Sequence, residues 1–309
     1  MNIIVINRKE SFSPRHIAKL SHAGTLTFIE TEAYQNHPAL QTTETTVLAV
    51  GPELTKWQFA NETFDTIDNL KAVCIPTTSF AWIDGLFLRN KGISLSNVPH
   101  YSTESVAEYA ISLMLNLAKK LPMVIQNNWT LDRSLHKGWE IKGKTMGIIG
   151  LGEIGKRIAQ LGKAMGLHVL YWSKHSRDDE FTYVELDTLL QSSDFIFPVL
   201  ARNDQTNKIL TKEKLNLIRT GGFLISITGE ELFDVDHAIE LIHANVLNGL
   251  AFEIDKYTIN NTKFKNIEGN ILVTPPIAWY THEAAEKNMN IWTENILAAA
   301  IYKAVNIVN

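Results

Sequence analysis

Three glycines with a fixed spacing carry the clearest chemistry in this sequence. Gly150, Gly152 and Gly155 form the pattern G-x-G-x-x-G in "TMGIIGLGEIGKRIA", after an apolar run and at the start of a helical pattern. In such a turn the first glycine permits a tight bend, the second admits a pyrophosphate, and the third lets helix and strand pack closely. The helix N-terminus then faces the phosphates. The pattern predicts a dinucleotide-binding loop that includes Glu153 and Ile154. The plain alternative is an ordinary tight turn between a strand and a helix.

The residues after the next apolar run, "HVLYW", bear on which dinucleotide binds. About 20 residues beyond such a loop, an acid normally holds the adenosine ribose 2′-hydroxyl. Ser173 stands at this place, so there is no carboxylate to repel a 2′-phosphate. Lys174 and Arg177 can pair with that phosphate, and Ser173 can hydrogen-bond it. The sequence therefore favours NADP(H) over NAD(H); the alternative is a solvated basic loop that accepts NAD(H).

Apolar runs alternate with helical patterns along the whole chain. Strands are predicted at 2–6, 45–51, 71–76 and 92–99, and in "TMGIIG", "HVLYW", "DFIFPVL", "GGFLISIT", "LNGLAFEI" and "NILVTP". Helices are predicted at 103–121, 153–165, 184–191, 211–218, 234–245 and 281–305. Strands that are apolar at every residue and joined by helices are typical of a parallel sheet covered on both faces. We expect an α/β protein of two Rossmann-like, doubly wound parallel-sheet domains, with the last helix returning to the first domain.

The bulk composition excludes several classes of function. The net charge of −4 and pI near 6.2 give no basic footprint for nucleic acid or an anionic membrane. The sequence has no apolar run of about 18 residues and no basic segment before its first apolar run, so we expect neither a membrane span nor a signal peptide. The ten histidines show no metal-binding spacing. The single cysteine, Cys74, lies in an apolar run and is expected to be a buried, inert thiol in a cytoplasmic protein.

Several segments together resemble one known family. "NKGISLSNVPHYSTESVAEYAISLMLNLAKKL", "KGKTMGIIGLGEIGKRIA", "SSDFIFPVL", "RTGGFLISITGEELFD", "LNGLAFEID" and "GNILVTPPIAW" occur in the family's order over nearly the whole chain. They resemble the D-isomer-specific 2-hydroxyacid dehydrogenases, such as glyoxylate/hydroxypyruvate reductases. The resemblance implies an NAD(P)-binding oxidoreductase of a small carbonyl substrate and a homodimer. It also implies a nucleotide domain at 100–279, inserted in a substrate domain made of 1–99 and 280–309.

The family's three reactive side chains are absent. Its arginine binds the substrate's carboxylate, its histidine protonates the carbonyl oxygen, and its glutamate raises the pKa of that histidine. Gly229, Pro276 and Thr258 stand at these places, in that order. Changes at three separate motifs predict lost or strongly impaired activity on 2-oxo and 2-hydroxy acids. The alternative is an active NADPH-dependent reductase of a 2-oxo acid or uncharged carbonyl, with His282 or Tyr280 as proton donor. Against that role, His282 also fits a solvent-facing residue in a first helical turn.

The surroundings of these places differ from the family as well. Glu230 and Glu231 replace two small residues after the arginine, and Trp279 replaces a glycine after the histidine motif. The family's substrate loop, whose backbone amides hold the carboxylate, falls here at Thr77, Thr78 and Ser79, and Trp82 replaces an asparagine. We expect a smaller and differently shaped substrate recess.

Three further residues also favour cofactor binding. Glu253 stands at the family's aspartate near the nicotinamide carboxamide. Ser105 and Val106 fall at the helix start that approaches the nicotinamide in the family. A purely structural role is the alternative for this pair, with Ser105 and Glu108 forming a capping box.

Overall fold

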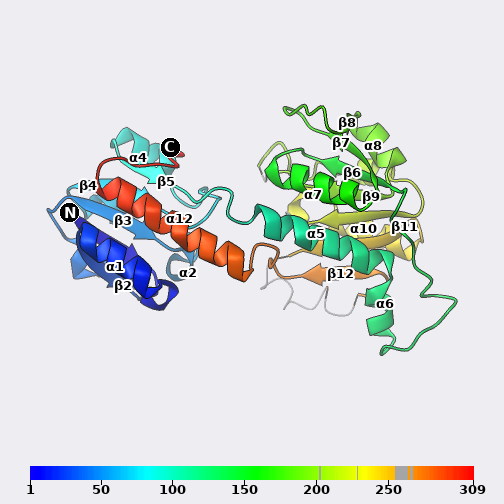
Figure 1. Cartoon of the computed structure of the whole chain (residues 1–309), viewed down its shortest axis with the longest axis horizontal. Helices are drawn as coiled ribbons and strands as arrows, with labels where there is room; N and C mark the ends of the chain where they lie inside the picture. Colours follow the sequence, from blue (N-terminus) through cyan, green and yellow to red (C-terminus); the bar gives the residue numbers. More distant parts are fainter. Residues whose placement is uncertain (202, 228, 255–263, 265–266) are drawn as a thin grey trace. The chain divides into compact units, whose positions relative to one another are not determined.

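A computed structural model describes the chain of 309 residues apart from 202, 228, 255–263 and 265–266. The chain divides into two compact units. Unit 1 comprises Met1–Tyr101 and His282–Asn309, and unit 2 comprises Ser102–Thr281. Each unit is a parallel α/β sheet covered by helices, which confirms the predicted fold class (Figure 1).

In unit 1 the described strands follow the order β2-β1-β3-β4-β5, and each neighbouring pair is parallel. The strands are β1 (Asn2–Ile6), β2 (Thr25–Ile29), β3 (Thr46–Val50), β4 (Leu70–Cys74) and β5 (Ser94–Ser96). The helices are α1 (Pro14–Ala23), α2 (Pro52–Thr55), α3 (Asn61–Asp65), α4 (Gly85–Asn90) and α12 (His282–Ala300).

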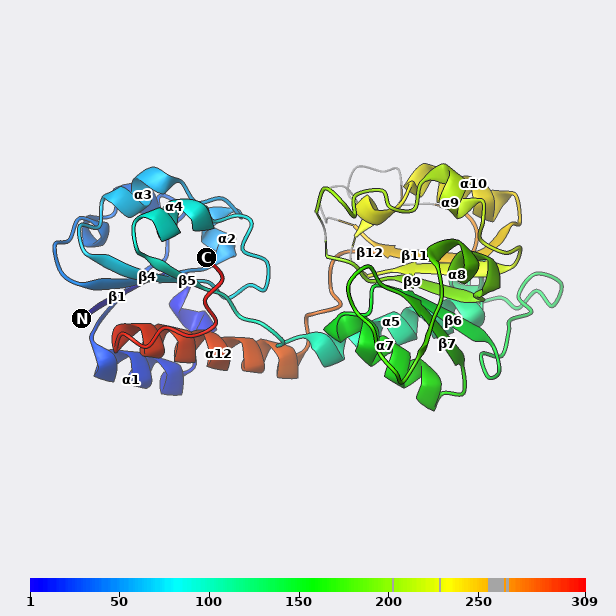
Figure 2. The same ribbon diagram turned by 90° about the horizontal axis from the view of Figure 1, so that it is seen from above.

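Alternate residues of the interior strand β1 enter different cores. Ile3 and Val5 pack in the cluster that holds Trp292 of α12, while Ile4 and Ile6 pack in the cluster that holds Leu88 of α4. This alternation follows from the pleat, which points successive side chains to opposite faces. Figure 2 shows α1 and α12 on one face of this sheet and α2, α3 and α4 on the other. Helix α12, at the C-terminal end of the chain, belongs to unit 1.

In unit 2 the described strands follow the order β12-β11-β10-β9-β6-β7-β8, again with parallel neighbours. The strands are β6 (Thr145–Ile149), β7 (His168–Trp172), β8 (Thr182–Tyr183), β9 (Phe195–Pro198), β10 (Gly222–Ser226), β11 (Leu247–Glu253) and β12 (Ile271–Thr274). The helices are α5 (Thr103–Ala118), α6 (Leu121–Gln126), α7 (Glu153–Ala164), α8 (Leu186–Ser192), α9 (Lys212–Leu215) and α10 (Val235–His243).

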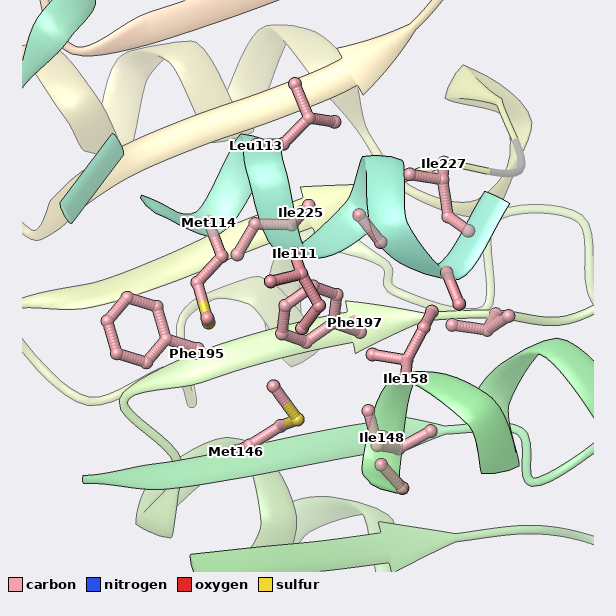
Figure 3. Packing of buried hydrophobic residues seen from close by; sticks show 14 of the residues in the cluster. Ile111, Leu113, Met114, Met146, Ile148, Ile158, Phe195, Phe197, Ile225 and Ile227 are labelled. Atoms are coloured by element: carbon pink, nitrogen blue, oxygen red, sulfur yellow. The ribbon is translucent and has the colours of Figure 1, made fainter. Parts of the chain in front are cut away.

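Helix α5 lies against the middle of this sheet. Its side chains Ile111 and Met114 pack with Ile148 of β6, Phe197 of β9 and Ile225 of β10 in one buried cluster (Figure 3). A second cluster on the other face joins alternate strand residues to α8, α9 and α10. Both faces are therefore buried, which explains why the strand sequences show no polar alternation.

Two local predictions are wrong, and one strand was missed. The capping box is absent: α5 begins at Thr103 after Ser102, and Ser105 lies buried inside the helix, where its hydroxyl bonds another segment. The helix predicted at 103–121 is shorter, because α5 stops at Ala118 and residues 121–126 form the separate helix α6, with Pro122 in its first turn. Strand β2 was not predicted; it is a sheet edge with mostly half-buried residues, so its apolar signal is weak.

The sequence predicted neither a membrane-spanning helix nor a metal site. Among the described residues, no helix is long and apolar enough to cross a membrane. In the same residues, no group of three or more histidine, cysteine, aspartate or glutamate side chains is arranged to hold a metal ion. Cys74 is a buried free thiol, and burial raises its pKa to about 12, so it has no nucleophilic thiolate at neutral pH.

Candidate cofactor and reaction site

The glycine turn after β6 has the geometry that its sequence predicts. Gly150 has φ of +101°, and a Cβ there would lie 2.5 Å from the Val199 carbonyl oxygen. A Cβ on Gly155 would lie 2.1 Å from the Gly150 carbonyl oxygen, so only glycine lets α7 pack this closely on the turn. Around Gly152, the N-cap residue of α7, a Cβ would meet no atom within 4 Å. Gly152 thus borders open space at the N-terminus of a twelve-residue helix, which fits a pyrophosphate.

The turn also lies at the switch point of the sheet. Strand β6 pairs with β7 on one side and with β9 on the other, so the connections from β6 and β9 leave in opposite directions. In open α/β sheets, ligands bind beyond the carboxyl ends of the strands at such a point. Glu153 and Ile154 form the first turn of α7 next to it.

The residues after β7 form a polar turn that holds an arginine. Ser173 is buried, and its hydroxyl oxygen accepts a hydrogen bond of 3.2 Å from the Ser176 N–H. Arg177 donates from Nη1 to the carbonyl oxygens of Ser173 at 2.8 Å and Ser176 at 2.9 Å. Its guanidinium carbon lies 3.9 Å from the centre of the Tyr183 ring. Among the described residues, Arg177 Nε and Nη2 have no hydrogen-bond partner and can donate to an anion. The Lys174 ammonium instead bonds the Gln205 side chain at 2.9 Å.

A second polar cluster in unit 2 fixes the segment after β12. The Glu253 carboxylate oxygen Oε1 accepts the backbone N–H groups of Ile277 and Ala278, each at 2.9 Å. The Ser105 hydroxyl donates to the Ala278 carbonyl oxygen at 2.5 Å. The sequence predicted cofactor contacts for Glu253 and Ser105, with a helix cap as the alternative for Ser105; the structure connects both side chains to this segment.

Sequence reasoning missed a neighbouring residue of α5. Tyr109 donates from its hydroxyl to Thr274 Oγ1 at 2.8 Å, at the end of β12. Burial raises the pKa of Tyr109, and the negative charge of Glu253 raises it further. Tyr109 lies four residues after Ser105, so both occupy one face of α5. That spacing is the signal that would have grouped them.

Comparison with known proteins decides the family. The model of the D-isomer specific 2-hydroxyacid dehydrogenase NAD binding domain matches residues 109–278, more than half of the chain. The chain belongs to this family. A Staphylococcus epidermidis protein named "Putative 2-hydroxyacid dehydrogenase" is 29% identical over 235 residues, which cover 72% of this chain and 73% of that protein.

Solved structures of other proteins share the complete fold. An acyclic imino acid reductase in complex with NADPH and D-Arg has a TM-score of 0.84 and 26% sequence identity, with 100% of both chains covered. A glyoxylate reductase from Paecilomyes thermophila has a TM-score of 0.85 over 100% of this chain and 98% of that one. At 19% sequence identity, this similarity is evidence for a shared fold alone.

Two of the three family reaction positions fall on described residues. Gly229 precedes a short 3₁₀ turn, Glu230–Leu232, with φ of +108°, and its carbonyl oxygen accepts from the Ser226 hydroxyl at 2.9 Å. An L side chain rarely adopts this φ, so the backbone here is specialised for glycine. Pro276 is exposed and lies directly before the segment that Glu253 holds. Thr258, the third position, lies outside the described residues.

The candidate proton donors, Tyr280 and His282, lie near Pro276 in the sequence, and both residues are exposed. Tyr280 is exposed and contacts the Trp279 ring edge-on, with 5.1 Å between ring centres. His282 is the first residue of α12 and is exposed. Glu231 is exposed and Glu230 is half-buried in the 3₁₀ turn. Surface residues without a catalytic role have the same degree of exposure.

The predicted substrate loop in unit 1 is tied by its own side chains. The Thr77 hydroxyl donates to the Ser79 carbonyl at 2.7 Å, and the Thr78 hydroxyl donates to the Val98 carbonyl at 2.9 Å. The Trp82 indole N–H lies 3.1 Å from both Thr77 Oγ1 and the Ser79 carbonyl oxygen. Trp82 therefore closes the loop with hydrogen bonds.

Proposed function

We propose that this family member binds NADP(H) and has lost or strongly reduced the standard reaction on 2-oxo and 2-hydroxy acids. The observation that carries the proposal is the pair Gly229 and Pro276 at the family's arginine and histidine positions. Neither side chain can hold a carboxylate or give a proton. The backbone at Gly229, with φ of +108°, also disfavours an arginine.

The size of the expected loss follows from the missing groups. General acid catalysis contributes about 10²–10⁴-fold to a rate. A charge-assisted hydrogen bond to a carboxylate contributes about 1.5–3 kcal/mol. Loss of both groups is therefore enough to lower the rate of 2-oxo acid reduction nearly to the rate that a bound cofactor would give without catalytic groups.

NADP(H) is the proposed cofactor because of the turn after β7. Ser173 leaves no carboxylate to repel a 2′-phosphate, and Arg177 presents a guanidinium fixed by two carbonyl oxygens and the Tyr183 ring. A preoriented guanidinium loses little side-chain entropy when it binds phosphate. NADPH in the acyclic imino acid reductase, 26% identical over the full chain, supports this choice.

A second candidate function is reduction of a carbon–nitrogen double bond. A protonated imine already carries a proton and a positive charge, so hydride addition at its carbon gives a neutral amine without a proton donor. A ketone instead gives an alkoxide, which needs one. The absence of arginine and histidine and the presence of Glu230 and Glu231 suit a cationic imine. The name of the imino acid reductase relative favours this candidate over the uncharged carbonyl with His282 or Tyr280 as donor.

One set of measurements tests both candidates. NADPH and NADH fluorescence titrations come first, followed by NADPH oxidation with glyoxylate or hydroxypyruvate, alone and with methylamine. Methylamine forms an imine with these acids, and trimethylamine, which cannot, is the matched control. Tight NADPH binding without turnover supports the first function; turnover only with methylamine, giving an N-methylamino acid, supports the second. Glyoxylate reduction without amine at kcat/KM above about 10⁴ M⁻¹s⁻¹ contradicts both.

The proposal includes a homodimer formed through unit 2 and a cytoplasmic location. Unit 2 exposes four large apolar side chains after α5: Ile125, Trp129, Leu131 and Leu135. A concentration of exposed apolar side chains marks interaction surfaces in soluble proteins. The cytoplasmic location rests on cysteine usage, since the single Cys74 is a free thiol.

A further inference from the structure

Unit 1 contains a hollow that the proposed function does not use. It has a volume of about 740 Å³ and lies between the α2–α3 connection and the start of α4. Its walls come from two sequence segments: Trp57, Gln58, Phe59, Ala60 and Asn61, and Ala81, Trp82, Ile83, Asp84 and Gly85. We call it the aromatic hollow.

Two tryptophans form adjacent walls of the aromatic hollow. The Trp57 and Trp82 rings lie 5.9 Å apart between centres, with an angle of 71° between their planes. Trp57 is 55% exposed, so its indole is accessible to a ligand. Such an arrangement offers π surface on two sides of one space.

The backbone that carries Trp57 is in a costly conformation. Lys56 has φ of 54° and Trp57 has φ of 58°, so two consecutive residues with a Cβ are left-handed. The Trp57 N–H bonds the Pro52 carbonyl oxygen at 3.2 Å, which fixes this turn. A strained backbone that holds an exposed indole over a hollow is a reason to look for a ligand.

A carboxylate borders the same space. Asp84 Oδ1 accepts the Phe87 N–H at 2.9 Å, and Oδ2 accepts from the Asn61 side chain at 3.0 Å. These hydrogen bonds, led by that from Phe87, hold the pKa of Asp84 below its ordinary value. Asp84 therefore carries its negative charge at neutral pH beside the two indoles.

One lining residue of the aromatic hollow, Phe59, is packed among other aromatic rings. Phe59 is buried, stacks on Tyr34 with 5.3 Å between ring centres, and contacts Phe64 at 4.7 Å. The connection that carries Trp57 is therefore anchored in the hydrophobic core of unit 1. A preformed wall needs little reordering when a ligand binds.

We propose that the aromatic hollow binds an organic cation, an alkylated ammonium group. The electron-rich faces of Trp57 and Trp82 and the carboxylate of Asp84 all attract positive charge. The same carboxylate repels anions. A rounded ammonium group can contact two walls that meet at a steep angle, whereas a flat guanidinium stacks best on a single face.

The aromatic hollow shares one residue with the predicted substrate loop. Trp82 contributes its ring to the hollow, and its N–H bonds Thr77 Oγ1 and the Ser79 carbonyl oxygen. A cation seated against Trp82 therefore contacts a residue that also holds the loop. The proposed cation site itself is independent of NADP(H) binding and of any reaction.

Choline is the probe, and 3,3-dimethylbutan-1-ol, its uncharged carbon analogue, is the matched control. Binding to the full chain is measured by calorimetry and by chemical shifts of the indole N–H groups. We expect choline to bind and to shift the Trp57 and Trp82 signals, with the alcohol at least about tenfold weaker. Trp57→Ala should weaken choline binding about 3- to 30-fold, and Trp57→Phe should restore part of it. Asp84→Asn keeps an N-cap side chain and should weaken binding about threefold or more.

The variant Trp129→Ala is the control for tryptophan removal, because Trp129 lies in unit 2 and is 70% exposed. It should leave choline binding unchanged. The proposal is overturned if the uncharged alcohol binds as well as choline, if the shifts fall on other indoles, or if folded Trp57→Ala binds choline normally. Circular dichroism of each variant verifies the fold.

Discussion

Ser105 and Ala278 lie 173 positions apart in the sequence, and the Ser105 hydroxyl donates a 2.5 Å hydrogen bond to the Ala278 carbonyl oxygen. The Glu253 carboxylate accepts hydrogen bonds from the N–H groups of Ile277 and Ala278. Three hydrogen bonds thus fix the two residues after Pro276. The backbone next to the family's histidine position is firmly held in this protein, although the histidine itself is absent.

Removal of the Glu253 carboxylate should destabilise unit 2. Glu253→Ala leaves the buried Ala278 N–H without its acceptor, while the more exposed Ile277 N–H can bond water. An unsatisfied buried donor costs about 1–3 kcal/mol, and we expect the free energy of unfolding in urea to fall by this amount.

Glu253→Gln is the control for this experiment, because its amide oxygen can accept the same two hydrogen bonds. Its loss should stay below about 1.5 kcal/mol, since only the charge assistance disappears. Equal losses for alanine and glutamine would show that the hydrogen bonds are not what Glu253 contributes.

The sequence predicted the parts of the fold that local patterns encode. β6, α7 and the turn between them follow from one apolar run, one helical pattern and three spaced glycines. The structure agrees because Gly150 and Gly155 each have a local steric reason, whereas Gly152 borders open space at the helix N-terminus. The cores on the two faces of each sheet were predictable for the same reason: strands buried on both faces must be apolar at every residue.

Long-range contacts were not predictable from these patterns. Ser105 resembled a cap because it precedes Glu108 by three residues, but its partner is a carbonyl on a distant segment. The aromatic hollow combines Trp57 and Trp82, which are 25 positions apart and belong to no shared motif. The left-handed backbone at Gly229 was likewise invisible, since the sequence shows only a missing arginine.

Gly229 should resist any L side chain. With φ of +108°, Gly229→Ala should lower the free energy of unfolding by about 1–2 kcal/mol, and Gly229→Arg by at least as much. Urea denaturation measures both. If Gly229→Arg is as stable as the natural protein, backbone conformation is not what excludes the arginine.

Gly152 should show the opposite behaviour. Its φ is −76° and a Cβ meets no neighbour, so Gly152→Ala should fold with a stability change within about 0.5 kcal/mol. The added methyl group projects toward the proposed pyrophosphate and should weaken NADPH binding at least about tenfold. Unchanged NADPH affinity would place the cofactor elsewhere.

The proposed dimer predicts a difference between two equally exposed leucines. Leu131 in unit 2 is 64% exposed and Leu86 in unit 1 is 65% exposed. Leu131→Asp would bury an unpaired charge at the interface, which costs about 3–5 kcal/mol, so the dimer should dissociate at least about 100-fold more readily. Leu86→Asp should leave the dimer intact. Sedimentation analysis that finds both variants dimeric would contradict an interface at Leu131.

Cofactor preference should depend on Arg177 and Ser173 separately. Arg177→Ala removes a charge-assisted partner of the 2′-phosphate, worth about 1.5–3 kcal/mol, so NADPH should bind about 10- to 150-fold more weakly. NADH lacks this phosphate and should change less than about threefold. Lys174→Ala is the control: because the Lys174 ammonium bonds Gln205, its removal should have a smaller effect than removal of Arg177.

Ser173→Asp should reverse the preference instead of only weakening it. An aspartate there can still accept the Ser176 N–H that Ser173 accepts, so the turn should persist. Its carboxylate would repel the 2′-phosphate of NADPH and accept a hydrogen bond from the ribose 2′-hydroxyl of NADH. Fluorescence titrations should show NADPH weakened and NADH strengthened. A parallel loss of both would instead indicate a disrupted turn, and tighter NADPH binding would contradict the assignment of this turn to the 2′-phosphate.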